Sequence, residues 1–202
     1  MFTVNTLIVS GREPLLGNSY KSFTEMTAQL IPLIPAERQA RKIRRENSIC
    51  PDLWECLDKV KDPEIPALSL WDMGILQNIE LEQGQVDKNV VVTITPTYSG
   101  CPAMDVIRED IESVLLNSGY EQVSVVSKLS PAWTTDWMTA EAKNRLRDYG
   151  IAPPEEMDHM HVQCPQCGSK NTRLISEFGS MACKALMQCR DCEEAFDHFK
   201  RI

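Results

Sequence analysis

Four cysteines near the C-terminus form two Cys-x2-Cys pairs, Cys164 with Cys167 and Cys189 with Cys192. A two-residue spacing lets a tight turn aim both sulfurs at one ion, and four thiolates in tetrahedral geometry are typical of structural zinc. Iron in a rubredoxin-like site remains the alternative, because cysteine spacing does not decide the metal. We predict a zinc ribbon over residues 164–202, too small to fold without its metal.

A fifth cysteine, Cys183, lies between the two pairs. It could be a thiol for a labile metal or for exchange, assisted by the charge of Lys184. Burial as a small apolar side chain is the interpretation that we favour. Three histidines flank the ribbon, and because four cysteines already fill the site we expect them to be surface or structural residues: His159, His161 and His198.

Cys101 is the candidate for chemistry outside the ribbon, because it lies where a predicted strand ends and a helix begins at Pro102. Helix N–H groups and the helix dipole favour a thiolate there, which could act as a nucleophile or bind a transferred metal or cluster. A buried structural cysteine is the alternative. A cysteine protease or thioesterase is difficult to build, because residues 1–158 contain no histidine base. Cys50 and Cys56 lack ligand spacing and are expected in the core or at the surface.

Three carboxylates, Asp62, Glu64 and Asp72, are candidates for acid–base work, although Asp62 is better explained as a turn former. Trp133 and Trp137 are four residues apart and are expected to pack on the core rather than form a ligand box. The chain has neither a G-x-G-x-x-G loop nor a P-loop, which makes a nucleotide-dependent enzyme a weak hypothesis.

The elements that must position Cys101 follow from hydrophobic periodicity and turn residues. The run 89–95 is almost entirely β-branched and predicts a strand, and apolar residues at helical spacing predict a buried helix face after Pro102. The full pattern is helix–strand–strand–helix–strand–helix, with these expected ranges: 51–60, 74–81, 89–95, 102–116, 121–128 and 140–147. We predict an α+β chain whose small α/β sandwich is followed by the β-rich ribbon.

The expected domain organisation has four parts. Residues 1–46 form a poorly ordered extension, residues 48–150 the sandwich, residues 151–163 a polar linker and residues 164–202 the ribbon. Met26 could be an internal start, which would leave the residues before it without a structural role.

Charge is distributed unevenly along the chain, which has a formal net charge of -8. The extension is basic, with its positive residues concentrated in a predicted helix from Ala36 to Glu46. An arm for nucleic acid or an anionic surface is one interpretation, and a solvated helix face or disordered tail is the one that we favour. The acidic remainder offers no basic stripe for nucleic acid. The basic run comprises Arg38, Arg41, Lys42, Arg44 and Arg45.

Composition narrows the class of protein further. Hydrophobic residues make up 43% and charged residues 25% of the chain, which excludes global disorder. No stretch approaches the length of a membrane helix, and the first ten residues do not form a secretory signal. Eight cysteines without a signal favour metal ligands or reactive thiols in a reducing cytoplasm, where we expect the protein to reside.

Several motifs together resemble a known family. The middle of the chain resembles the SufT-like domain of iron–sulfur assembly factors, and its combination with a ribbon resembles the D-subunit family of the phenylacetyl-CoA epoxidase (ring 1,2-epoxidase) system. The resemblance covers residues 48–202 and not residues 1–46. The motifs that carry it are Asp62–Pro66, Asp72–Ile75, Thr95–Ala103, Pro131–Met138, Leu174–Ser180 and Cys183–Leu186.

The resemblance implies an accessory subunit in aerobic phenylacetate catabolism, not a catalytic one. Such a subunit assists iron or iron–sulfur cluster insertion into a partner, either an oxygenase subunit with a di-iron site or a reductase subunit with flavin and a cluster. Cys101 matches the motif cysteine of the family and becomes the candidate for transient iron or cluster handling. A non-catalytic scaffold with only a structural zinc is the alternative, and a homodimer stays open. Met181 departs from the small polar residue that the family pattern leads us to expect.

Overall fold

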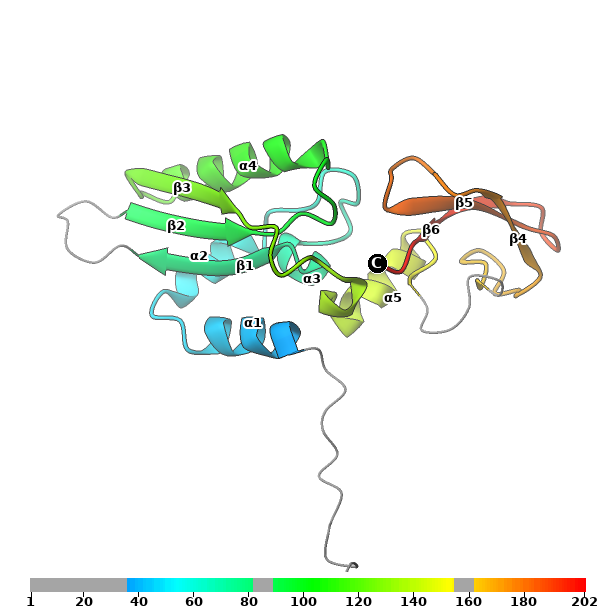
Figure 1. The fold of residues 1–202 in the computed structure, drawn as a ribbon, viewed down its shortest axis with the longest axis horizontal. Helices are drawn as coiled ribbons and strands as arrows, with labels where there is room; N and C mark the ends of the chain where they lie inside the picture. Colours follow the sequence, from blue (N-terminus) through cyan, green and yellow to red (C-terminus); the bar gives the residue numbers. More distant parts are fainter. Residues whose placement is uncertain (1–35, 82–88, 155–161) are drawn as a thin grey trace, which may run out of the picture. The chain divides into compact units, whose positions relative to one another are not determined.

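The computed structural model describes residues 36–81, 89–154 and 162–202 (Figure 1). All of the described residues belong to one compact unit. None of the described helices is long and apolar enough to cross a membrane. The elements in chain order are α1 (Ala36–Glu46), α2 (Pro51–Leu57), α3 (Leu70–Met73), β1 (Leu76–Leu81), β2 (Asn89–Ile94), α4 (Ala103–Asn117), β3 (Gln122–Ser127), η1 (Thr135–Trp137), α5 (Ala140–Asp148), β4 (Thr172–Ser176), β5 (Lys184–Cys189) and β6 (Ala195–Phe199).

The α+β fold class is confirmed: helices accompany two three-stranded sheets. In the first sheet the β-branched strand β2 is central, antiparallel to β1 and parallel to β3. A parallel pair needs a crossover connection, which α4 supplies between β2 and β3. The loop from β2 to α4 therefore begins at the end of the central strand, and Cys101 lies in this loop.

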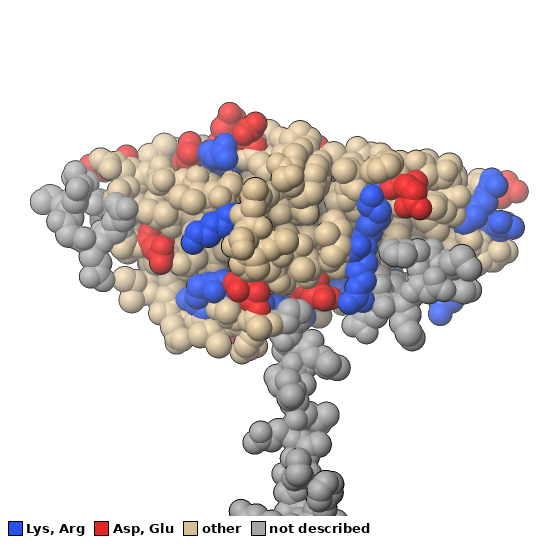
Figure 2. Space-filling model, in the orientation of Figure 1, with Lys and Arg blue, Asp and Glu red and all other residues tan. Residues whose placement is uncertain are grey.

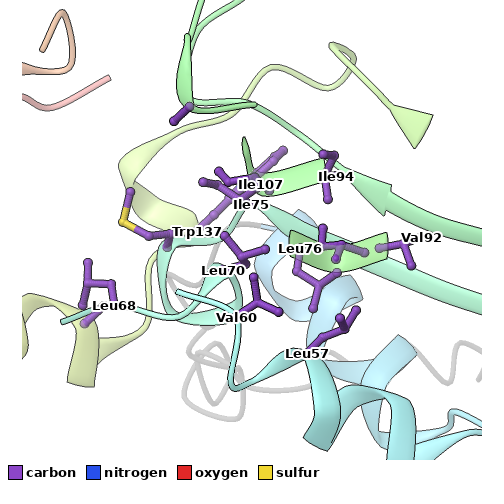
Figure 3. Packing of buried hydrophobic residues seen from close by; sticks show 14 of the residues in the cluster. Leu57, Val60, Leu68, Leu70, Ile75, Leu76, Val92, Ile94, Ile107 and Trp137 are labelled. Carbon is purple, nitrogen blue, oxygen red and sulfur yellow. The ribbon is translucent and has the colours of Figure 1, made fainter. Parts of the chain in front are cut away.

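The core of this region is formed by apolar side chains from every layer. Val90, Val92 and Ile94 alternate along β2 and are fully buried, as the strand pattern requires. Figure 3 shows Leu57 and Ile107 among the side chains that fill this core. Helices α2 and α4 contact each other, and both contribute buried side chains to this core.

Helix α1 is held against the first sheet by a buried arginine. The Arg41 guanidinium donates to the carbonyl oxygens of Leu76 (3.1 Å), Trp137 (2.9 Å) and Trp71 (3.0 Å). It also lies 4.4 Å from the centre of the Trp71 ring, and only 1% of Arg41 is exposed. The solvated-face interpretation is therefore wrong for Arg41, because three carbonyls from distant segments replace its water. The proposed start at Met26 lies outside the described residues.

Charge on the surface is mixed rather than segregated. On the face shown in Figure 2, basic and acidic side chains are interspersed with uncharged residues, and acidic side chains lie close to the basic ones. Arg45 contributes to this mixing, since its guanidinium donates twice to the carboxylate of Asp58 at 2.9 and 2.6 Å. The basic run therefore pairs partly with acidic groups of the chain itself.

The second sheet is antiparallel, in the order β4-β5-β6. Part of the ribbon packs into the core of the sandwich, because Phe199 and Cys183 belong to the same buried cluster as the side chains of α2 and β2. Ala152, which lies in the segment expected to be a linker, pairs with β6: its N–H donates to Asp197 and its carbonyl accepts from Phe199. The ribbon is thus connected to the sandwich by packing and backbone hydrogen bonds as well as by chain continuity.

Candidate functional site

The four ribbon cysteines converge on one point, with all four sulfur atoms within 4.8 Å of one another. The Sγ atoms of Cys164 and Cys192 are 3.8 Å apart, and those of Cys167 and Cys189 are 3.6 Å apart. A tetrahedron with metal–sulfur bonds of about 2.3 Å has edges of about 3.8 Å. The arrangement of the four thiols therefore suits a tetrahedral metal ion, and the chain carries a metal site.

Each Cys-x2-Cys pair forms a turn of the same shape. The residue after the second cysteine has a left-handed backbone in both turns, with φ of 76° at Gly168 and 61° at Glu193. Backbone N–H groups of Cys192 and Asp191 donate to the sulfur of Cys189 and lower the pKa of that thiol to about 7. The second turn therefore supports a thiolate at Cys189, whereas hydrogen bonds with neighbouring thiols raise the pKa of Cys167 and Cys192.

Cys101 is half-buried in the loop between β2 and α4. Its N–H donates to the carbonyl of Tyr98 at 3.2 Å, which closes a turn and directs the chain into α4. The N–H of Ala103 and the hydroxyl of Tyr98 both donate to its sulfur. Pro102 is the N-cap of α4 rather than its first residue, one position from expectation.

The expectation of an acidic Cys101 thiol is wrong. Burial raises its pKa above the ordinary value for cysteine, and the negative charges of Asp62 and Glu64 raise it further. Hydrogen bonds from Ala103 and Tyr98 lower the pKa, but by less than the combined effect of burial and charge. Sequence position placed the helix N-terminus correctly, but it could not show how much solvent Cys101 loses.

The structure brings Cys183 of the ribbon into the surroundings of Cys101. Cys183 is buried, as predicted, but in the core of the sandwich, against which Cys101 also packs. Burial raises the pKa of Cys183 to about 11; the charge of Lys184 lowers it, whereas Cys101 raises it. Sequence reasoning treated the two thiols separately, and no sequence pattern links them.

Two of the carboxylate candidates, Asp62 and Asp72, have structural roles in the fold. Asp62 forms the predicted turn, since its Oδ1 accepts from the N–H groups of Glu64 and Ile65, both at 2.9 Å. Asp72 accepts from Ser69 in a capping box and pairs with Arg145, so its carboxylate is fully engaged. These contacts make Asp72 an anchor between α3 and α5 rather than an acid–base group.

The aromatic and histidine candidates are also structural where the structure describes them. Trp133 and Trp137 are both buried in the core, and the ring of Trp133 lies against Phe199 with 6.1 Å between centroids. The Nδ1 atom of His198 lies 3.3 Å from the carbonyl oxygen of Ala152 in a buried position. The other two histidines, His159 and His161, lie outside the described residues.

Two cysteines of the sandwich lie apart from these sites. Cys50 is buried and its Sγ lies 4.0 Å from the carbonyl oxygen of Ile79. Cys56 is half-buried, with its Sγ 3.7 Å from Ser118 Oγ. Both agree with the expectation of core or surface positions.

Comparison with protein families gives two matches along this chain. Residues 51–126 match the model described as iron–sulfur cluster assembly protein, and residues 153–200 match the model described as PaaD zinc beta ribbon domain. The first match includes Cys101, and the second includes all four ribbon cysteines. Helix α1 precedes both matches.

Three known proteins illustrate the similarity. The D subunit of the 1,2-phenylacetyl-CoA epoxidase of Escherichia coli (strain K12) is 47% identical over 156 residues, which cover 75% of this chain and 92% of that protein. An Fe-S protein maturation auxiliary factor of Porphyromonas gingivalis is 37% identical over 99 residues, 47% of this chain and 88% of the factor. The crystal structure of a DUF59 domain from Bacillus anthracis covers 54% of this chain and 95% of its own, at 24% identity and a TM-score of 0.43. By the extent and identity of the first of these matches, the chain belongs to the D-subunit family of 1,2-phenylacetyl-CoA epoxidases, with an iron–sulfur cluster assembly region followed by a PaaD zinc β-ribbon.

Proposed function

We propose that this protein is an accessory subunit of the phenylacetyl-CoA epoxidase system that assists insertion of iron or an iron–sulfur cluster into a partner subunit. The observation that carries the proposal is Cys101: a half-buried thiol at the start of α4, inside the region that matches iron–sulfur assembly proteins. The partner is the reductase or the oxygenase subunit that the family resemblance implies. Membership in a subunit family and 37% identity to a maturation factor support the same role.

Cys101 is the residue proposed to hold the transferred iron. Two donors, the Ala103 N–H and the Tyr98 hydroxyl, point at its sulfur and would stabilise a negatively charged thiolate. A raised pKa does not prevent ligation, because a metal ion displaces the proton when it binds. It does reduce side reactions of the free thiol at neutral pH, since the thiolate is the reactive form.

Zinc is the metal that we propose for the ribbon. Four thiolates at tetrahedral spacing and N–H donors to their sulfurs fit zinc, and the family model is named for a zinc ribbon. Its role is structural, because all four ligand positions are filled by protein and none is left for a substrate. Metal analysis of the purified chain tests this directly: we expect one zinc per chain and its loss in a Cys164→Ser variant.

The maturation role is tested by producing the epoxidase subunits together with Cys101→Ser. We expect the iron and cluster content of the partner subunit to fall, because the proposed carrier has lost its ligand. Cys56→Ser is the matched control, since Cys56 is another half-buried thiol of the same region. Full cluster occupancy with the Cys101 variant would contradict the proposal.

A scaffold that docks epoxidase subunits, with Cys101 inert, is the second candidate. The observation that favours it is the raised pKa of Cys101, which a thiol specialised for nucleophilic reaction would not have. The two functions differ in how they respond to the Cys101 variant. A scaffold would keep partner binding and partner cluster content unchanged, whereas a maturation factor would keep binding and lose cluster content.

A further inference from the structure

The first sheet has a small polar pocket on one face. Its volume is 210 Å³, which is room for about seven water molecules, so it suits a ligand of similar size. Residues of α1, β1, β2 and the segment after β3 line the pocket. Six of them are uncharged polar or basic residues that belong to the sheet or follow it: Gln77, Asn78, Thr93, Thr95, Lys128 and Ser130.

The alternation along β2 places two threonines in this pocket. Val92 and Ile94 are buried in the sandwich core, so Thr93, which lies between them, points to the opposite face of the sheet. Thr95 follows on that face, since its N–H still donates to a carbonyl across the sheet at 2.8 Å and continues the pairing beyond β2. On β1, Asn78 lies opposite Thr93 in the antiparallel register and adds an amide to the same face.

Gln77 joins the pocket through an irregularity in β1. The pairing with β2 shifts register between Leu76 and Asn78, which leaves Gln77 as the extra residue of a β-bulge. Its Nε2 donates to the carbonyl of Gly74 at 2.7 Å, and its Oε1 is buried without a hydrogen-bond partner among the described residues. Buried acceptors in folded proteins are normally paired with a donor. We therefore expect a ligand of this pocket to carry a donor for this oxygen.

The hydroxyls and the positive charge of the pocket are not committed to contacts within the described part of the chain. Thr93 and Thr95 are 5% and 3% exposed, yet neither hydroxyl makes a hydrogen bond with another described residue. The Lys128 ammonium likewise has no ion pair or hydrogen bond there. Arg44, the other cation that lines the pocket, is neutralised by Glu37. The pocket thus offers hydroxyl donors and one uncommitted positive charge.

The pocket lies at the carboxyl ends of the parallel strands. β2 and β3 run in the same direction, and the N–H of Lys128, directly after β3, donates to the carbonyl of Ile94 at the end of β2 at 2.8 Å. Beyond this point the chain leaving β2 leads to α4, whereas the chain leaving β3 leads to η1 and α5 (Figure 1). Ligands of open α/β sheets bind in the crevice outside the carboxyl ends of the strands, where such connections diverge.

We propose that this pocket binds a small monoanionic carboxylate that also carries a hydroxyl group. Lys128 and the hydroxyls of Thr93 and Thr95 bind the carboxylate, and Gln77 Oε1 accepts from the hydroxyl of the ligand. One uncommitted cation matches one negative charge, whereas a phosphate monoester carries a charge closer to -2. The inference goes beyond the proposed function, because the site includes neither Cys101 nor any residue of the ribbon.

The test is a titration of the full chain, with zinc retained in the ribbon, followed by ¹H–¹⁵N NMR. The probe is lactate, a small hydroxy acid, and we expect it to shift the amide signals of Gln77, Thr93, Thr95 and Lys128 with a Kd of about 1 mM. Propionate lacks the hydroxyl and should bind about two- to tenfold more weakly. Lactamide lacks the charge and should bind at least about tenfold more weakly.

Two substitutions with matched controls assign the binding to the pocket. Thr95→Val removes a hydroxyl at nearly constant shape, and Lys128→Met removes the charge of an exposed residue, so the fold should be kept in both. Each should weaken lactate binding, by about two- to tenfold for the hydroxyl and about tenfold or more for the charge. The controls are Thr97→Val, at a buried threonine outside the pocket, and Lys59→Met, at an exposed lysine outside it, and both should bind as the parent does.

Four results would overturn the proposal. An absence of lactate-induced shifts in the pocket would leave water as its only occupant. Equal affinity for lactate and lactamide would exclude the role of charge, and equal affinity for lactate and propionate would exclude the hydroxyl contact. Tighter binding of inorganic phosphate than of lactate would contradict a monoanion site, and equal effects of the control substitutions would place the binding elsewhere. Cys101→Ser should bind lactate as the parent does, so this test and that of the proposed function can fail separately.

Discussion

Replacing Arg41 with alanine tests how helix α1 is attached to the sheet. The change removes a charged donor from three carbonyls, of which those of Leu76 and Trp137 accept buried hydrogen bonds. Leaving a buried acceptor unsatisfied costs about 1–3 kcal/mol, so two such carbonyls and the lost stacking on Trp71 should lower the free energy of unfolding by about 4 kcal/mol. Burial lowers the pKa of Arg41 to about 10, so the guanidinium is charged at neutral pH.

Urea unfolding followed by tryptophan fluorescence measures this effect, because all four tryptophans lie in residues 48–150. The matched control on the same helix is Lys42→Ala, whose partner Glu46 is 3.7 Å away with both side chains mostly exposed. An exposed pair of this kind contributes at most about 0.5 kcal/mol. A loss below about 1 kcal/mol in Arg41→Ala, or one equal to that in Lys42→Ala, would refute the assignment of α1 as part of the folded body.

Three further predictions follow from strain, thiol chemistry and the metal site. Gly74→Ala should lower the free energy of unfolding by about 2–5 kcal/mol, because φ is 79° and the new carbon would lie 2.8 Å from Trp137 Cβ. The control is Gly119→Ala, where φ is 89° but the space around the residue is open, so the loss should be only about 1–2 kcal/mol. Equal losses in the two variants would contradict a steric contribution at Gly74. Alkylation of Cys101 by iodoacetamide in iron-free protein should be slower at neutral pH than that of an ordinary exposed cysteine and should keep rising as the pH is raised, because burial raises the pKa of this thiol. A rate that reaches its plateau near neutral pH, seen by mass spectrometry, would show a lowered pKa instead. Removing the ribbon metal with a chelator should abolish hydrogen-exchange protection in β4–β6. It should also weaken protection in the sandwich core, because Phe199 of β6 belongs to that core, and restoring zinc should recover both. Protection that survives chelation would mean that the ribbon folds without metal.

Local sequence was enough for most of the elements and for the metal site. The hydrophobic periodicity that identifies strand β2 and helix α4 lies within each element's own residues. Their observed bounds therefore agree with expectation to within a residue or two. A Cys-x2-Cys turn is equally local, because four residues decide where two sulfurs point. The short helix α3 was missed, since its capping box at Ser69 and its left-handed end at Gly74 leave only four helical residues, too few for a periodic pattern.

The chemistry of Cys101 was decided by tertiary structure. The sequence located the thiol at a helix start, which favours ionisation, but burial and two carboxylates from the segment before α3 reverse the direction of the pKa shift. A pKa depends on all charges and solvent around a group, and these come from parts of the chain that sequence spacing does not relate.

The burial of Arg41 and the location of Cys183 also depended on contacts between distant parts of the chain, which sequence spacing does not reveal. A basic helix with few apolar residues is normally solvated, and only the fold supplies three carbonyls at one point to bury its arginine. A cysteine between two metal-binding turns was correctly expected to be buried, but which core receives it depends on how the ribbon packs. The sequence by itself therefore determined the family, the elements and the four-cysteine site, because these depend on short-range patterns; the folded chain decided which of the other polar groups lose water and which of them meet.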